Sequence, residues 1–323
     1  MSKVLAITGA ASYISRHLIP YLNSSNMQID QFIGLDIRSI DFHSEIPFSF
    51  YECDIRDDFS KILEENGVTD LIHLAWTVSP IHNKKKAYQV DIEGTKNTLV
   101  QANKANIDYF LHASSTLCYG AFPDNPYPLT ENDQLRGNQN FHYSYHKTLA
   151  EQLLDEFEKF CEMKIGRIRP SPILSGDLDS YVSEILRGGW RTFFSLPYPN
   201  RDTHIQFLHI SDVLKGFQIM LEYRLVGPYN LTPDYDVKVG EIPEILKKRG
   251  LRMPYRVLKI LLWFQWKLRL SQVPPAYLDF VAYPYVASNQ KLRTYGFLPE
   301  YSTKEALASL IKPSSVSKEK LIQ

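Results

Sequence analysis

Residues 4–22 read VLAITGAASYISRHLIPYL, and this stretch decides the fold class. The apolar run at residues 4–8 ends in Gly9 and predicts a buried parallel strand. The apolar side chains of residues 16–22 recur at helical spacing, which predicts a helix directly after the turn. At a strand–turn–helix junction of this kind, the pyrophosphate of a dinucleotide can meet the N-terminus of the helix.

The alternation of strands and helices continues up to residue 170. Further strand-like runs lie at residues 32–36, 48–54, 70–75, 109–114 and 165–168, and helical patterns lie at residues 88–105 and 144–160. This order predicts an α/β fold with a Rossmann-type, doubly wound parallel sheet that helices cover on both faces.

We expect residues 1–170 to form the dinucleotide-binding domain. Beyond residue 170 the loops are rich in Pro and Tyr and the helices are shorter. This predicts a smaller α/β substrate lobe at residues 171–312, with the segment around 205–232 returning to the first domain. Residues 313–323 are rich in Ser and Lys and predict a frayed tail.

The composition excludes several classes of protein. With 323 residues, 44% hydrophobic and 22% charged, the chain is globular rather than disordered. The formal net charge is +0, so no overall field recruits nucleic acid. Three cysteines are too few for a disulfide framework or a cysteine-based zinc site, and we expect no metal. The sequence shows no signal peptide and no apolar run of spanning length, which predicts a cytoplasmic protein.

The turn after the first strand keeps only Gly9 of the usual glycine fingerprint, because Ser12 and Ser15 replace the second and third glycines. A side chain at position 12 crowds the approach of phosphate, but its hydroxyl can offset this by a hydrogen bond. We expect Ser12, Tyr13 and Ile14 to contact the cofactor. An ordinary strand–helix turn is the alternative interpretation.

Two carboxylates favour the cofactor interpretation. Asp36 closes the second predicted strand, where an acid accepts hydrogen bonds from an adenosine ribose and favours NAD over NADP. Arg38 can instead pair with a 2′-phosphate, which keeps NADP possible. Asp54 ends the third predicted strand beside Ile55, where we expect it to bind the adenine. Either Asp can alternatively serve as a strand-end cap.

Tyr143 and Lys147 lie four residues apart at the start of a predicted helix. The ammonium favours the phenolate, which lowers the pKa of the tyrosine and makes it a general acid or base. Lys147 can also reach the nicotinamide ribose, whereas Tyr145 has no lysine four residues later. Ser115, at the end of the fifth predicted strand, can bind the substrate oxygen that Tyr143 protonates. The alternatives are an exposed helix pair and a turn-capping serine.

The histidines show no spacing typical of metal ligands. We expect His73, His112 and His209 to have structural roles because they fall in or beside predicted strands. His142 and His146 flank Tyr143, where they can relay protons, although we expect them to face solvent.

Short motifs follow one another along the chain: Thr8-Gly9, Asp36, Asp54-Ile55, His73-Leu74-Ala75, Gly94-Thr95, Ser114-Ser115, Tyr119-Gly120, Tyr143 with Lys147, Arg169-Pro170, residues 209–213 and Tyr229-Asn230-Leu231. In this order the chain resembles the extended short-chain dehydrogenase/reductases, specifically the NAD-dependent epimerase/dehydratase family. The resemblance runs from residue 4 to about residue 310.

The resemblance implies that Ser115, Tyr143 and Lys147 form the catalytic trio of an NAD-dependent enzyme. It also implies that Gly9, Asp36 and Asp54 hold the adenosine half of the cofactor. Leu74 and Ala75 are expected to line the cofactor. A homodimer formed by the helices near residues 88–105 and 144–160 is implied as well.

The chain departs from the family at three informative positions. Asp91 stands where relatives usually carry Asn. Pro172 and Ile205 stand where nucleotide-sugar members usually place an Asn and a diphosphate-binding Arg. Arg191, Arg201 and His204 lie nearby as substitutes, but a planar guanidinium fork is hard to replace.

We therefore predict an oxidoreductase that transfers hydride at a secondary alcohol or ketone of an apolar or non-nucleotide substrate. A nucleotide-sugar epimerase or dehydratase is one alternative. A cofactor-binding protein without catalysis is the other.

Residues 256–270 are strongly apolar with interspersed cations. From Lys247 to Arg269 there are eight Lys or Arg and no Asp or Glu. Such a segment, within residues 247–270, can lie at an anionic membrane surface. The alternative is a helix that packs over the substrate pocket while its lysines reach water.

Overall fold

The computed structural model describes residues 3–40, 42, 44–176, 181–186, 195–271 and 273–311. The expected frayed tail at residues 313–323 lies outside these residues. The chain divides into two units, each made of three segments. Unit 1 comprises Met1–Ser114, His146–Arg169 and Leu214–Tyr229, and unit 2 comprises Ser115–Tyr145, Pro170–Val213 and Asn230–Gln323.

Unit 1 is built on a seven-stranded sheet in the order β11-β6-β5-β4-β1-β2-β3. Its strands are β1 (Val4–Thr8), β2 (Gln31–Asp36), β3 (Phe48–Glu52), β4 (Asp70–His73), β5 (Tyr109–Ala113), β6 (Lys164–Pro170) and β11 (Gly227–Leu231). All pairings from β3 across to β6 are parallel. This strand order confirms the predicted Rossmann-type fold.

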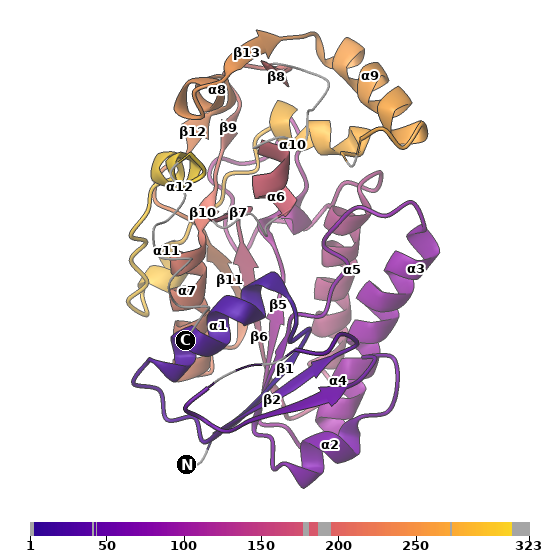
Figure 1. Ribbon diagram of the computed structural model, residues 1–323, viewed down its shortest axis with the longest axis vertical. Coiled ribbons are helices and arrows are strands. Elements are labelled where there is room, and N and C mark those ends of the chain that lie inside the picture. Colours follow the sequence, from indigo (N-terminus) through magenta and orange to yellow (C-terminus); the bar gives the residue numbers. More distant parts are fainter. Residues whose placement is uncertain are drawn as a thin grey trace. The chain divides into compact units, whose positions relative to one another are not determined.

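Helices cover both faces of this sheet (Figure 1). They are α1 (Tyr13–Asn23), α2 (Ser60–Glu65), α3 (Lys84–Tyr88), α4 (Gly94–Lys104), α5 (His142–Phe157) and α7 (Ile210–Tyr223). Leu63 of α2, Leu99 of α4 and Leu154 of α5 are fully buried in one apolar cluster with Ile33 and Phe110 of the strands. Leu99 and Leu154 lie in the helical patterns predicted at residues 88–105 and 144–160, and their burial is what such patterns predict; α2 was not predicted.

The helix predicted at residues 88–105 is interrupted. A π-helical turn at Gln89–Glu93 separates α3 from α4, with Asp91 fully buried inside it. The apolar spacing of the sequence carries no sign of this turn. Wide helical turns of this kind are frequent at functional sites.

The turn between β1 and α1 requires a residue without a side chain. Gly9 has φ +72°, and a Cβ on it would lie 2.6 Å from the backbone nitrogen of Ala75 and 2.8 Å from the carbonyl carbon of Leu74. The amide of Gly9 donates to the carbonyl of Leu35 at 2.8 Å. The turn is therefore held against the chain that leaves β4, at the point where the strand order reverses.

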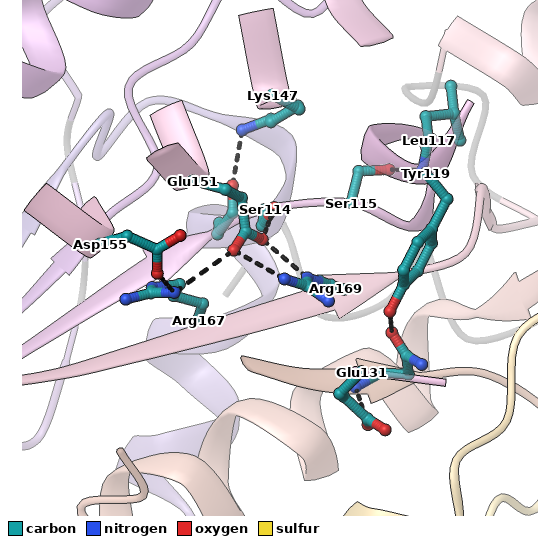
Figure 2. A network of polar contacts seen from close by, with 12 residues as sticks. Ser114, Ser115, Leu117, Tyr119, Glu131, Lys147, Glu151, Asp155, Arg167 and Arg169 are labelled. Carbon is teal, nitrogen blue, oxygen red and sulfur yellow. Dashed lines mark hydrogen bonds and ion pairs between the residues drawn. The ribbon is translucent and has the colours of Figure 1, made fainter. Parts of the chain in front are cut away.

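A buried ionic network fixes α5 to the sheet (Figure 2). The carboxylate of Glu151 accepts from Ser114 Oγ at 2.5 Å and from Arg169 Nε and Nη2 at 2.8 and 2.9 Å. Arg167 lies 3.8 Å from the same carboxylate and also binds Asp155. Burial raises the pKa of Glu151, but Arg169 and Arg167 outweigh it, so the pKa lies below its usual range. Glu151 therefore stays ionised and links α5 to the ends of β5 and β6.

Unit 2 combines short strand pairs with short helices. Its strands pair as β7 (Ile173–Leu174) with β10 (Leu208–His209), β9 (His204–Ile205) with β12 (Val237–Lys238), and β8 (Ser195–Tyr198) with β13 (Arg249–Arg252). Its helices include α6 (Tyr181–Glu184), α8 (Ile242–Ile245), α9 (Tyr255–Lys267), α10 (Asp279–Ala282), α11 (Gln290–Arg293) and α12 (Thr303–Ser309). Their core gathers Phe207, Phe280, Tyr285 and Leu307, all buried.

Replacing Gly9 by Ala tests the close approach of the turn to β4. The matched control is Gly67→Ala, because Gly67 also has positive φ but no atom within 4 Å of an added Cβ. The control should lose about 1–2 kcal/mol of unfolding free energy from its backbone conformation alone. Gly9→Ala should lose about 1–3 kcal/mol more because the turn must move. Equal losses in urea unfolding would contradict the required close approach.

Candidate active site

The N-terminus of α1 is suited to an anion. Ser12 is its N-cap, and Ser12 Oγ accepts from the amide of Ser15 at 3.3 Å. The first turn of α1, which includes Tyr13 and Ile14, carries no acidic residue. The positive end of the helix dipole therefore stands at the Gly9 turn without a competing carboxylate. The hydroxyl of Ser12, expected at a phosphate, serves in this structure as the cap.

Ser15 occupies the position of the third glycine and is fully buried. Its Oγ has no hydrogen-bond partner within the part of the chain that the structure describes. A buried hydroxyl without a partner is costly unless a bound group completes it. The glycine turn, the helix N-terminus and this hydroxyl together fit the pyrophosphate of a dinucleotide.

Asp36 lies beside this turn, at the end of β2. Its Oδ2 accepts from the amide of Ala11 at 2.9 Å, and its Oδ1 accepts from the amide of Arg38 at 3.0 Å. Arg38 Nε lies 3.5 Å from the carboxylate, and the Arg38 side chain is 67% exposed. Asp36 thus fixes the turn, and its remaining lone pairs can accept from a ribose.

Asp54 is paired with a residue that sequence reasoning missed. Arg56 donates Nε and Nη2 to the two carboxylate oxygens of Asp54 at 2.9 and 2.5 Å. This hydrogen bonding is the main cause that lowers the pKa of Asp54. Ile55 is buried, and its Cδ1 would lie 2.5 Å from a Cβ on Gly94. The stretch after β3 is therefore held against α4.

His73 joins three elements beside Leu74 and Ala75. Its Nδ1 lies 2.7 Å from Thr8 Oγ1 in β1, and its Nε2 lies 2.9 Å from Thr95 Oγ1 in α4. Burial, with a smaller effect of Lys147, lowers the pKa of His73 to about 3. His73 is therefore neutral, and its expected structural role is confirmed.

Lys147 is held in the interior of unit 1. Its Nζ donates to the carbonyl of Ala113 at 2.6 Å and lies 3.4 Å from the ring centre of Trp76. The residue is 3% exposed. A cation this far from water acts strongly on any group close to it. Trp76, one residue after Ala75, was not expected to take part in the site.

His146 and Asp91 form a buried pair next to Lys147 in the chain. His146 Nδ1 lies 2.8 Å from Asp91 Oδ2, and Asp91 Oδ1 accepts from the amide of Thr77 at 2.8 Å. The expectation that His142 and His146 face solvent is wrong, because both side chains are buried. The reason is that His146 points toward the π-helical turn, which no local pattern shows.

Tyr143 lies on the first turn of α5, one helical turn before Lys147. Within unit 2 its ring lies 6.1 Å from that of Phe141. The neighbouring Ser144 Oγ donates to the carbonyl of Leu117 at 2.7 Å and accepts from the amide of Asn138 at 2.9 Å. The start of α5 is thereby attached to the turn that follows Ser115.

Ser115 caps this turn, a 3₁₀ helix at Thr116–Tyr119. Its Oγ accepts from the amide of Leu117 at 3.2 Å (Figure 2) and donates to the carbonyl of Pro170 at 3.3 Å. The capping interpretation therefore holds for Ser115, whatever its further role. Sequence reasoning missed Thr116, whose buried Oγ1 lacks a partner among the residues described.

The expected site residues fall into two groups. Lys147 and every candidate for cofactor binding lie in unit 1, gathered at the ends of β1, β2, β3 and β4 and on α5. Ser115 and Tyr143 lie in unit 2. One continuous helix, α5, carries both Tyr143 and Lys147.

Unit 2 contains an apolar cavity of about 80 Å³. Its wall includes Ile205, Phe207, Val239, Ile242, Tyr277, Phe280 and Tyr285. The ring of Phe141 lies 5.7 Å from that of Tyr277 and 5.6 Å from that of Phe280. Burial, with a smaller effect of Tyr143, raises the pKa of Tyr277. The cavity therefore borders the cluster in which Tyr143 packs.

The residues expected to substitute for a diphosphate-binding Arg are engaged or not described. His204 Nδ1 lies 2.5 Å from Asp236 Oδ1. The side chain of Arg201 packs against Gly240, where an added Cβ would lie 2.1 Å from Arg201 Cγ. Arg191 lies outside the residues that the structure describes.

Among curated proteins, UDP-glucuronic acid decarboxylase 1 of Arabidopsis thaliana is 25% identical over 260 residues. The match covers 76% of this chain but only 58% of that protein. UDP-glucose 4-epimerase of Lactobacillus helveticus is 25% identical over 284 residues, covering 78% of this chain and 83% of that protein.

Among solved structures, UDP-glucose 4-epimerase of Thermotoga maritima with UDP-glucose has a TM-score of 0.73 at 16% identity. The Thermus thermophilus UDP-glucose 4-epimerase complex with NAD has a TM-score of 0.73 at 18% identity. Each match covers 96% of this chain and 98% of the other. At these identities the likeness shows the fold.

The family model of the NAD dependent epimerase/dehydratase family matches residues 5–231. The matched region contains the Gly9 turn, Asp36 and the helix that carries Tyr143 and Lys147. The chain therefore belongs to the NAD-dependent epimerase/dehydratase family of enzymes.

Proposed function

We propose that this protein catalyses reversible hydride transfer at a carbinol carbon, with Tyr143 as the group that takes or gives the hydroxyl proton. The observation that carries the proposal is the position of Lys147. It is a buried cation, fixed by Ala113 and Trp76, on the same helix as Tyr143 and one turn away.

When bound, NAD supplies the position that accepts or returns the hydride. The chain supplies the proton chemistry and the placement. The buried ammonium of Lys147 favours the phenolate form of Tyr143, which lets the tyrosine act as a base. Ser115 can donate its hydroxyl to the substrate oxygen in place of its long 3.3 Å bond to Pro170.

In unit 1, we propose that the amides at the start of α1 bind the pyrophosphate and that Asp36 binds the adenosine ribose. The carboxylate of Asp36 repels a 2′-phosphate, which favours NAD. The exposed Arg38 is the group that would bind a 2′-phosphate if NADP were used.

For the substrate, the relatives support a nucleotide sugar best, because the curated proteins reported above act on UDP-sugars by their names. A second candidate is a non-nucleotide alcohol or ketone with an apolar substituent. The cavity in unit 2 favours it, since Ile205 is part of the apolar wall at the position where nucleotide-sugar members usually have Arg. A cavity of about 150 Å³ holds benzene, so this smaller one suits an aliphatic group.

Calorimetric titration of the NAD-loaded protein separates these candidates. UDP-glucose, UDP-glucuronic acid and a dTDP-sugar form one panel, and aliphatic secondary alcohols form the other. Saturable binding of a sugar nucleotide supports the first candidate and contradicts the second. Binding confined to the alcohols does the reverse.

We also propose a homodimer through α4 and α5. Val100 on α4 and Tyr88 at the end of α3 are 44% and 42% exposed, which leaves apolar surface for a second copy. Light scattering measures the mass directly, and a mass of one chain at micromolar concentration contradicts the dimer.

Tyr143→Phe removes the proton-carrying oxygen and little else. With the substrate identified, turnover should fall about 10²–10⁴-fold, while NAD binding should change less than about twofold. The matched control is Tyr145→Phe on the same helix, which should keep turnover. Unchanged turnover in Tyr143→Phe would contradict the assignment of Tyr143 as the group that transfers the proton.

Asp91 should act as a positioning residue for Lys147. Its carboxylate bonds both Thr77, next to Trp76, and His146, next to Lys147. Asp91→Ala removes both bonds, so kcat should fall up to about 100-fold with a smaller change in KM. Asp91→Asn can accept from Thr77 and donate to His146, and it should restore most of the lost kcat. If Asp91→Asn and Asp91→Ala lower kcat equally, the hydrogen bonds of Asp91 do not position Lys147.

A further inference from the structure

Helix α9 (Tyr255–Lys267) carries apolar side chains on two sides. Leu258 and Leu262 are buried, in contact with Leu278. The exposed large apolar side chains on and just after the helix are Val257, Ile260, Trp263, Phe264 and Leu268, at 45%, 56%, 45%, 53% and 65%. We call these five residues the α9 face.

The α9 face is a continuous stripe. Positions 257, 260, 264 and 268 follow one another at intervals of three or four residues, which places them on one side of a helix. Five large apolar side chains exposed together therefore mark a surface that binds a partner.

Cations lie on α9 and directly before and after it in the chain. Between Lys247 and Arg269 there are eight Lys or Arg and no acidic residue, and Arg252, Arg256, Lys267 and Arg269 are exposed. Lys267 Nζ lies 4.8 Å from the ring centre of Trp263, so a cation and an apolar ring occupy the same part of the surface.

Lys259 pairs with Asp279, but within the described part of the chain no carboxylate forms an ion pair with Arg252, Arg256, Lys267 or Arg269. Asp279 is 9% exposed and accepts from Tyr255 and Lys259, away from the α9 face. Glu241, just before α8, and Glu244, in α8, are exposed, and neither forms an ion pair with a cation of α9 among the residues described. The partner should therefore bring both an apolar interior and negative charge.

We propose that the α9 face docks on an anionic lipid membrane, with Trp263 and Phe264 among the acyl chains and the cations at the lipid phosphates. A helix with a charged border and Trp or Phe on its apolar side lies in the plane of such an interface. With 13 residues, α9 is about 20 Å long, which is shorter than the hydrocarbon core. Within the described ranges, no helix is long and apolar enough to cross a membrane.

The charge pattern selects a membrane over a second copy of the chain. In a two-fold dimer through this face, the cations of one protomer would meet those of its partner. Like charges in contact disfavour such an interface. This inference stands apart from the proposed reaction, because it depends on no residue of the active site.

Co-sedimentation of the full chain with vesicles tests the proposal. Vesicles of equal parts phosphatidylglycerol and phosphatidylcholine should bind the protein at low salt and release it at high salt. Phosphatidylcholine alone should bind it much less. No sedimentation with the anionic vesicles at low salt overturns the proposal, as does equal binding to both.

Two sets of variants assign any binding to the α9 face. Trp263→Ser with Phe264→Ser should abolish binding, whereas the exposed aromatic control Phe160→Ser, 84% exposed in unit 1, should not. Each of Arg252→Gln, Arg256→Gln and Arg269→Gln should weaken binding about fivefold. The control substitutions Lys61→Gln and Lys304→Gln, at exposed positions elsewhere, should have little effect.

The charge variants keep the test valid if the double aromatic variant misfolds, since they change exposed side chains only. Vesicle binding that all variants retain contradicts the α9 face. Loss of a concentration-dependent dimer in these variants, without vesicle binding, would show that the face joins two copies instead.

Discussion

The peptide at Gly9 lies so close to the chain leaving β4 that no side chain fits between them. The strand order reverses at this point, since β1 lies between β2 and β4 and the chain passes to opposite sides of it. The carboxyl ends of parallel strands that diverge in this way leave a crevice, which is where α/β sheets bind ligands. The path of the chain at this turn therefore explains why position 9 is a glycine and why the N-terminus of α1 and Asp36 lie beside it.

Buried charges then fix the elements that carry the chemistry. Glu151 is bound by Arg169 and Ser114, so α5 cannot slide along the ends of β5 and β6. Lys147 is held by the carbonyl of Ala113 and the ring of Trp76. Asp91 binds Thr77, the residue after Trp76, and His146, the residue before Lys147. A buried charge is tolerated only when each of its contacts is in place. The geometry of α5 is therefore narrowly defined even without substrate.

Local pattern was sufficient for six of the seven strands of the sheet, β11 being the exception, and for the helix of Tyr143 and Lys147. The run at residues 4–8 gave β1 with its observed bounds, because a buried parallel strand is apolar throughout. The pairing of Asp54 with Arg56 and the burial of His146 were missed. So was the π-helical turn that holds Asp91. The burial of His146 beside this turn depends on a contact between residues 55 apart in the sequence, whereas Arg56 stands only two residues after Asp54 and could have been considered as its partner. The sequence also left open whether the apolar side chains of residues 256–270 are exposed, since periodicity alone does not tell which apolar side of a helix is covered.

The most direct test of the account is to denature the freshly purified protein and assay the supernatant for nicotinamide dinucleotide. Protein that proves empty is then titrated with NADH and NADPH. If the Gly9 turn and α1 hold the cofactor, the protein releases NAD, or it binds NADH saturably and more tightly than NADPH. A protein that releases no dinucleotide and binds neither NADH nor NADPH would contradict the claim that the Gly9 turn and α1 hold the cofactor.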